Sequence, residues 1–103
     1  MEVKIYNFLM KYCQGKENLI KNKDLRLLFD VGSDKSLRKI IQNIRESTDY
    51  KHVVGSVSGK SGGFYICTND EEILETIKNI EHRANQMLRM SYVLKWKRDK
   101  YNG

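Results

Sequence analysis

The sequence contains no proline, so glycine is the only remaining residue type that strongly interrupts a helix. Six of its seven glycines lie between residues 15 and 63, and the seventh is the last residue. From residue 64 to residue 102 the sequence therefore has no strong helix breaker. A chain of 103 residues has room for one small core, so we expect a compact N-terminal part followed by one long helix.

Before residue 48, apolar residues recur at the three- and four-residue spacing of a helix face. This spacing predicts helices over residues 3–13, 23–29 and 34–47. We expect Asn22 to cap the second helix and Ser33 to cap the third, because both side chains can accept hydrogen bonds from free helix amides. The residues expected to face the core are Ile5, Phe8, Leu9, Tyr12, Leu25, Leu28, Phe29, Leu37, Ile40, Ile41 and Ile44.

The pattern then changes to β-branched and aromatic residues over 53–57 and 63–67, separated by a small, polar, glycine-rich stretch. It predicts a β-hairpin with Lys60 near its tip. The apolar pair Leu19-Ile20 is long enough to form one further, very short strand. The order helix, short strand, helix, turn, helix, hairpin is that of a winged helix-turn-helix domain, an α+β fold that is mainly helical. We expect this domain over residues 1–68.

Residues 69–103 are expected to form a separate long helix. Thr68 and Glu71 have the spacing of a capping box at its start. Apolar and small residues then follow a heptad seam, which indicates either a homodimer with paired helices or a helix that folds back on its own domain. The expected dimerisation residues are Ile77, Ile80, Ala84, Met87, Leu88, Ser91 and Leu94.

Two segments resemble small phage and prophage winged helix-turn-helix proteins of low-GC Gram-positive bacteria. Residues 22–45 are similar to the second and third helices of that fold. Residues 62–73 resemble its wing, where a Gly-aromatic-aromatic strand leads into an Asn-acidic-acidic-Ile helix start. The resemblance implies a DNA-binding protein in the cytoplasm of a bacterial host, acting in transcription or replication.

The formal net charge of +6 suggests a polyanionic partner, and the third helix carries many of the side chains suited to one. Lys, Arg, Ser, Gln and Asn can donate to phosphates or read base edges in a major groove. An ordinary solvated helix face has a similar composition. The expected contacts to double-stranded DNA are Lys35, Ser36, Arg38, Lys39, Gln42 and Asn43, with Lys51 and Lys60 beside them.

A second hypothesis is a phage-encoded inhibitor or adaptor that binds a host protein, for example a CRISPR effector, through the same basic face. The modest net charge and the acidic residues Asp34 and Glu46 at the ends of the third helix favour this alternative. Neither hypothesis requires a cofactor.

Other function classes are not expected. The segment from Gly55 to Ser61 resembles a phosphate-binding loop, but it has three residues between its glycines where that loop has four, and it leads into a strand. Cys13, Cys67 and the two histidines lack metal-ligand spacing, and we expect both thiols to be free. No catalytic constellation, signal peptide or membrane-spanning run is recognisable, so we expect a non-enzymatic intracellular protein.

Overall fold

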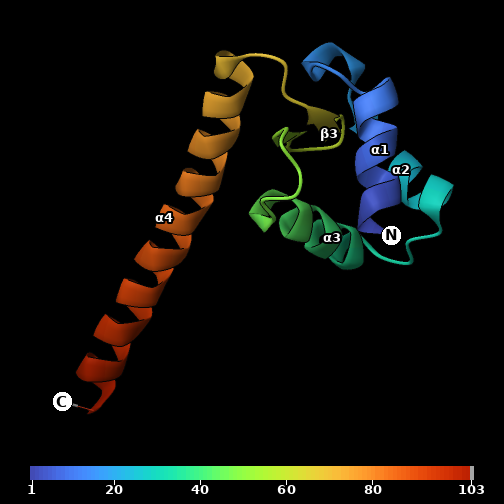
Figure 1. Ribbon diagram of the computed structural model, residues 1–103. Helices are drawn as coiled ribbons and strands as arrows, with labels where there is room; N and C mark the ends of the chain where they lie inside the picture. Colours follow the sequence, from blue (N-terminus) through green and yellow to red (C-terminus); the bar gives the residue numbers. More distant parts are fainter. Residues whose placement is uncertain (103) are drawn as a thin grey trace. The chain divides into compact units, whose positions relative to one another are not determined.

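The computed structural model describes residues 1–102, which form two compact units, residues 1–73 and the part of the chain from Leu74 onward (Figure 1). The protein is α+β and mainly helical, and it ends in one long helix, as predicted. The elements in chain order are α1 (Glu2–Tyr12), the 3-10 helix η1 (Lys16–Asn18), β1 (Ile20–Lys21), α2 (Asn22–Phe29), α3 (Asp34–Glu46), β2 (Val54–Val57), β3 (Gly63–Ile66) and α4 (Asp70–Asn102).

The three strands form an antiparallel sheet in the order β1-β3-β2. The predicted hairpin is the β2–β3 pair, in which Val57 lies opposite Gly63. The Leu19-Ile20 region does contribute a strand, with Ile20 opposite Phe64. Gly63 allows this third strand to approach, because a Cβ atom at that position would lie 2.0 Å from the Ile20 carbonyl oxygen.

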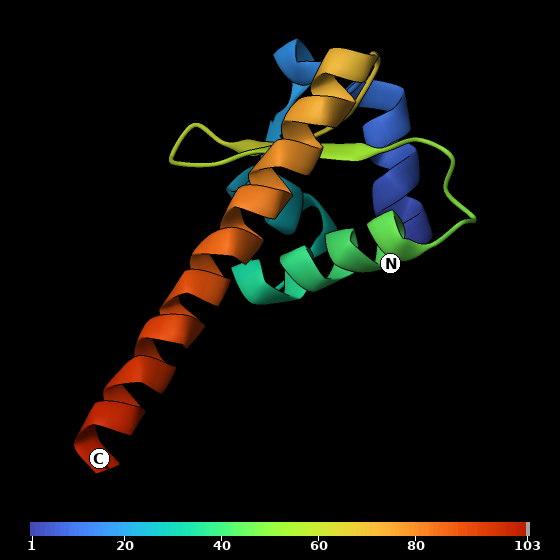
Figure 2. The same cartoon turned by 90° about the vertical axis from the view of Figure 1, so that its left-hand side faces the viewer.

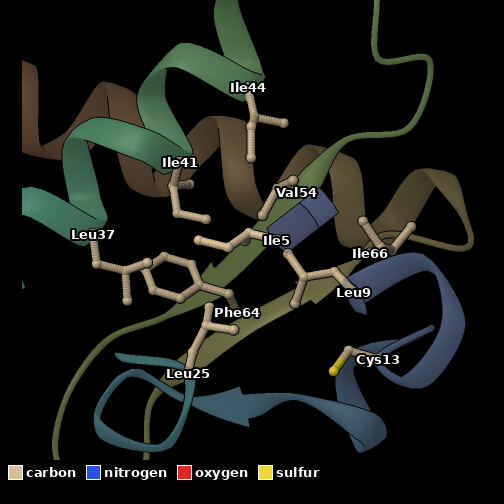
Figure 3. Close-up of a cluster of buried hydrophobic side chains, with 10 residues drawn as sticks. All are labelled: Ile5, Leu9, Cys13, Leu25, Leu37, Ile41, Ile44, Val54, Phe64 and Ile66. Carbon is tan, nitrogen blue, oxygen red and sulfur yellow. The ribbon is translucent and has the colours of Figure 1, made fainter. Parts of the chain in front are cut away.

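The core lies between the sheet and the helices of the first unit, as Figure 3 shows. Side chains alternate along β3, so Phe64 and Ile66 face the helices while Tyr65 faces the other side. Tyr65 is nevertheless buried, and its ring occupies the space where a Cβ atom on Gly55 would lie. The buried cluster consists of Ile5, Leu9, Cys13, Leu25, Leu37, Ile41, Ile44, Val54, Phe64 and Ile66.

Two residues expected in the core are exposed. Leu28 is 59% exposed and Tyr12 is 58% exposed. The eight-residue helix α2 buries Leu25 and turns Phe29 toward α1, where the Phe29 ring meets Phe8 at 5.6 Å between centroids. Leu28 is therefore left at the surface. Tyr12 packs on Phe8 from outside, with 5.0 Å between the ring centroids.

The predicted helix cap is confirmed for α3 and is wrong for α2. Ser33 caps α3 as predicted, since its hydroxyl accepts a hydrogen bond from the Ser36 amide at 3.1 Å. Asn22 does not cap α2, because it is the first residue of that helix and Lys21 precedes it without a side-chain cap. The Asn22 amide instead joins α2 to α3, as described below.

The start of α4 is fixed by a capping arrangement shifted by one residue from the predicted Thr68–Glu71 pair. Asn69 is the cap, and its side chain accepts a hydrogen bond from the Glu72 amide at 2.9 Å. The buried Glu72 carboxylate accepts hydrogen bonds from the amides of Thr68 and Lys16, both at 2.8 Å. These two hydrogen bonds hold the pKa of Glu72 below its ordinary value, and the one from the Thr68 amide has the larger effect. Glu72 thus joins the start of α4 to η1.

We predict that Glu72→Gln lowers the free energy of unfolding at pH 7 by about 2 kcal/mol, because the two backbone amides lose the charged carboxylate that accepts their hydrogen bonds. The low pKa of Glu72 stabilises the folded state above the ordinary value of 4.5, and this contribution disappears as pH falls below it. The difference between wild type and variant should therefore shrink in acid. Urea denaturation from pH 3 to pH 7 measures it. Glu71→Gln, at an exposed neighbouring carboxylate, is the control, and an equal loss there would contradict the assignment.

Candidate nucleic-acid interface

The solvent-facing side of α3 gathers most of the predicted contact residues. The helix turns Leu37, Ile41 and Ile44 into the core and packs the half-buried Ile40 against it, so the opposite side of the helix faces solvent. Asn43 is half-buried at the edge of this outer side. The exposed predicted residues of α3 are Lys35, Ser36, Arg38, Lys39 and Gln42.

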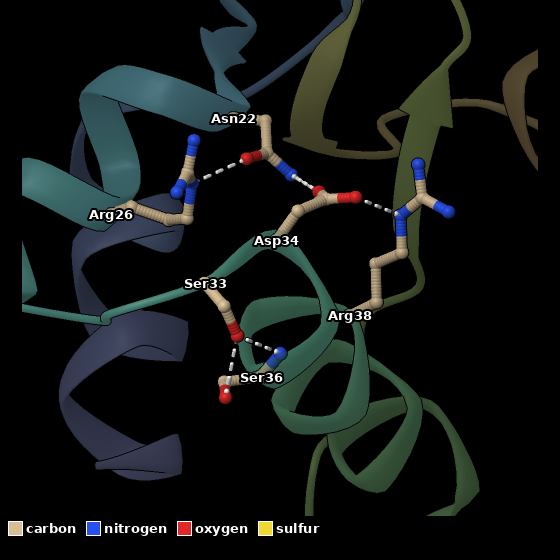
Figure 4. A network of polar contacts seen from close by, with 6 residues as sticks. All are labelled: Asn22, Arg26, Ser33, Asp34, Ser36 and Arg38. Carbon is tan, nitrogen blue, oxygen red and sulfur yellow. Dashed lines mark hydrogen bonds and ion pairs between the residues drawn. The ribbon is translucent and has the colours of Figure 1, made fainter.

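A polar network ties this face to α2 (Figure 4). The Asn22 side-chain amide donates to Asp34 Oδ1 at 2.6 Å, and Arg26 Nε donates to Asn22 Oδ1 at 2.9 Å. Asp34 Oδ2 also lies 3.0 Å from Arg38 Nε. The ion pair is open to solvent, with the Arg38 side chain 67% exposed, so it orients the guanidinium more than it stabilises the fold. The terminal nitrogens of Arg38 point away from Asp34 in Figure 4.

The remaining side chains of the α3 face divide into engaged and available groups. Gln42 donates to Glu46 at 3.0 Å, and the Ser36 hydroxyl accepts a hydrogen bond from Ser33 at 2.9 Å. The side chains of Lys35 and Lys39 make no hydrogen bond or ion pair to any other residue that the structure describes, and both are exposed. These two ammonium groups can therefore meet an anion without first giving up a partner in the chain.

Arg45 belongs to the same helix but has a structural role. Its Nε donates to the Val54 carbonyl at 2.8 Å, and its Nη2 donates to the Ser56 hydroxyl at 3.1 Å. Arg45 thereby joins the last turn of α3 to β2. The sequence pattern does not separate this cation from its exposed neighbours, because the strand it contacts lies beyond a loop.

Lys51 and Lys60 lie on loops outside α3, and both are exposed. Lys60 is in the tip of the β2–β3 hairpin, where the Gly62 amide donates to the Gly59 carbonyl at 3.0 Å. Gly59 has a φ of 95°, which favours glycine at this turn. Figure 2 shows the loop projecting from the end of the sheet. Lys51 precedes His52, whose amide donates to the Tyr6 hydroxyl at 3.2 Å.

The predicted dimerisation residues form part of the second unit. Within α4, Ile77, Ile80, Met87 and Leu94 are between 43% and 71% exposed. Ala84 and Leu88 are also exposed, and Ser91 is half-buried. The helix therefore presents a row of apolar side chains along the part that follows the first unit.

The described residues include no group of three or more His, Cys, Asp or Glu side chains that could hold a metal ion. Cys13 and Cys67 are buried free thiols, and burial raises the pKa of Cys13. None of the helices in residues 1–102 combines the length and apolar character needed to cross a membrane.

In comparisons with known proteins, no protein-family model, curated protein or solved structure matches the chain. The interpretation of the α3 face therefore depends on its own residues and geometry.

We predict that the hydrogen-bonded Arg45 and the exposed Lys39 of α3 contribute differently to stability. Arg45→Met should lower the free energy of unfolding by about 1–3 kcal/mol, because the Val54 carbonyl and Ser56 lose their donor. Lys39→Met, on the exposed side of the same helix, should change it by no more than about 0.5 kcal/mol. Thermal or urea unfolding measures both. Equal effects would show that Arg45 does not anchor β2.

Proposed function

We propose that the chain is a winged helix-turn-helix protein that binds double-stranded DNA, with α3 as its recognition helix. The observation that carries the proposal is the exposed polar side of α3, on which two unpaired lysines stand beside Arg38, Gln42 and Asn43. A helix of this kind fits the major groove, where such side chains contact phosphates and base edges.

The arrangement around α3 supports the winged-helix assignment. The order α1-β1-α2-α3-β2-β3 and the sheet order β1-β3-β2 are those expected for this class. In the proposed complex the β2–β3 hairpin is the wing, and Lys60 contacts the backbone beside the groove. Lys51 adds a further phosphate contact.

Within α3 the proposal gives the side chains different roles. Lys35 and Lys39 contact phosphates, because an ammonium acts as a mobile point charge. Gln42 and Asn43 carry amides that can pair with base edges, adenine above all. Arg38 reaches the DNA with its terminal nitrogens while Asp34 holds its Nε.

The proposed protein acts as a homodimer joined through α4, as regulators of this class do when they bind two half-sites. A role in transcription or replication of a phage or mobile element rests on the sequence resemblance.

A second candidate function is binding to a host protein, and the carboxylates on the α3 face favour it. Asp34 pairs with Arg38, and Glu46 accepts from Gln42, so the face presents anions as well as cations. A protein surface of mixed charge would complement such a face, whereas phosphates would be repelled from its acidic positions.

A titration with a random-sequence duplex at several salt concentrations tests the proposal. Each phosphate contact contributes about −0.9 to the slope of log affinity against log salt. We expect Lys39→Ala to weaken binding several-fold and to reduce the magnitude of that slope by about one. Fluorescence anisotropy of labelled DNA measures both quantities.

Lys11→Ala is the matched control, because it removes the same charge from the last turn of α1. Its slope should remain that of wild type. Absence of binding at low salt, or equal effects of the two substitutions, would contradict DNA recognition by α3 and favour the protein-binding candidate.

A further inference from the structure

We propose that α4 pairs with α4 of a second copy in the antiparallel direction, with Ala84 of each chain facing the partner's Met87. This inference rests on the homodimer of the proposed function and specifies how its two chains are joined.

The exposed apolar row on α4 requires a partner. Large apolar residues recur on the helix from Leu74 to Leu94, and each is at least 43% exposed. A single helix in water gains little stability from its own backbone, and contiguous apolar surface of this kind normally marks an interaction site. The 33-residue length of α4 provides more than three heptads for pairing.

The heptad pattern limits which residues can face each other. In the seam, Ile77, Ala84 and Ser91 are the a positions, and Ile80, Met87 and Leu94 are the d positions. Antiparallel helices place an a position of one chain against a d position of the other. In the register that overlaps the seam completely from Ile77 to Leu94, the facing pairs are Ile77 with the partner's Leu94, Ile80 with the partner's Ser91 and Ala84 with the partner's Met87.

This register matches small side chains with large ones. Ala84 and Ser91 are the small residues of the seam, and each faces a large residue of the other chain. A parallel, in-register pair would instead place Ala84 against the partner's Ala84 and Ser91 against the partner's Ser91. Such layers leave space unfilled, and alternating large with small residues across an interface avoids it.

The surface around Ser91 is compatible with such a pair. A shallow, open hollow on α4 is lined by Met87, Met90, Ser91, Leu94, Lys95 and Arg98. Met87, Met90, Ser91 and Leu94 have the spacing of the four-residue hole that accepts one side chain in knobs-into-holes packing. The partner's Ile80 is the side chain that the register brings to this hole.

Charge along α4 favours the same direction. Residues 70–81 carry five carboxylates and one lysine, whereas residues 89–100 carry five cations and one carboxylate. Parallel pairing would place each group beside its own copy. Antiparallel pairing places the acidic segment of one chain beside the basic segment of the other, which lowers the electrostatic energy. A second copy thus satisfies the charge pattern and the apolar row together.

Crosslinking of mixed full-length chains tests the direction. Ile77→Cys and Leu94→Cys chains are prepared separately, mixed under reducing conditions and treated with a short bismaleimide. Two copies of residue 77 lie about 25 Å apart along the axis in the antiparallel pair, beyond the linker, because each helical residue rises 1.5 Å. We expect covalent dimers in the mixture and none with either variant alone. Wild type, whose two thiols are buried, is the control.

Sedimentation of each variant accompanies the crosslinking. If either substitution in the seam dissociates the dimer, the pair Leu74→Cys and Lys95→Cys, which flanks the seam, replaces it. Crosslinks within a single variant would show parallel helices and overturn the proposal. A dimer without any crosslink would overturn its register, and monomeric wild type would overturn the pairing itself. DNA binding is measured separately, so a monomer that binds DNA refutes only the dimer.

Discussion

The burial of β3 is the constraint on which the rest of the first unit depends. This four-residue strand pairs with β1 on one edge and with β2 on the other. Phe64 and Ile66 enter the helical core, while Tyr65 is buried on the opposite face. Helix α1 packs against β3 itself, whereas α2 packs against β1 and α3 against β2, the two strands that β3 holds in the sheet. Gly63 makes the pairing with β1 possible. The orientation of α3 therefore depends on β3 only indirectly, through β2, which α3 contacts and which Arg45 also binds.

Sequence patterns predicted the helices α1 to α4 and the strands β1 to β3, but they did not predict the 3-10 helix η1. Periodicity works where an element must bury one face in a small core. It also placed Lys35 and Lys39 on the outer side of α3. It could not predict contacts between elements, and Asn22 is the clearest case. A local pattern favours capping for this residue, but its side chain donates to Asp34 across the turn and accepts from Arg26 within α2. Likewise, Glu72 rather than Glu71 binds the free amides, because Lys16 approaches from η1.

The helices α3 and α4 differ in the kind of surface they expose. On α3 the exposed residues are polar and charged, whereas α4 from Leu74 onward exposes a row of apolar side chains flanked by charge. The net charge of +6 averages over both and describes neither. The net charge also gives the same weight to Arg45, whose guanidinium is hydrogen-bonded to β2, as to Lys39, whose side chain is unpaired.

The ion pair between Asp34 and Arg38 has a consequence for competition among DNA sites. A genome offers on the order of a million or more non-specific sites, so the ratio of specific to non-specific affinity decides occupancy. A carboxylate beside an arginine repels every phosphate backbone equally, and it therefore weakens binding to all sequences. Base contacts made elsewhere on the same helix keep their full discrimination. In the proposed complex, Asp34 therefore lowers specific and non-specific affinity by the same factor, and the ratio between them depends on the amide side chains that contact the bases.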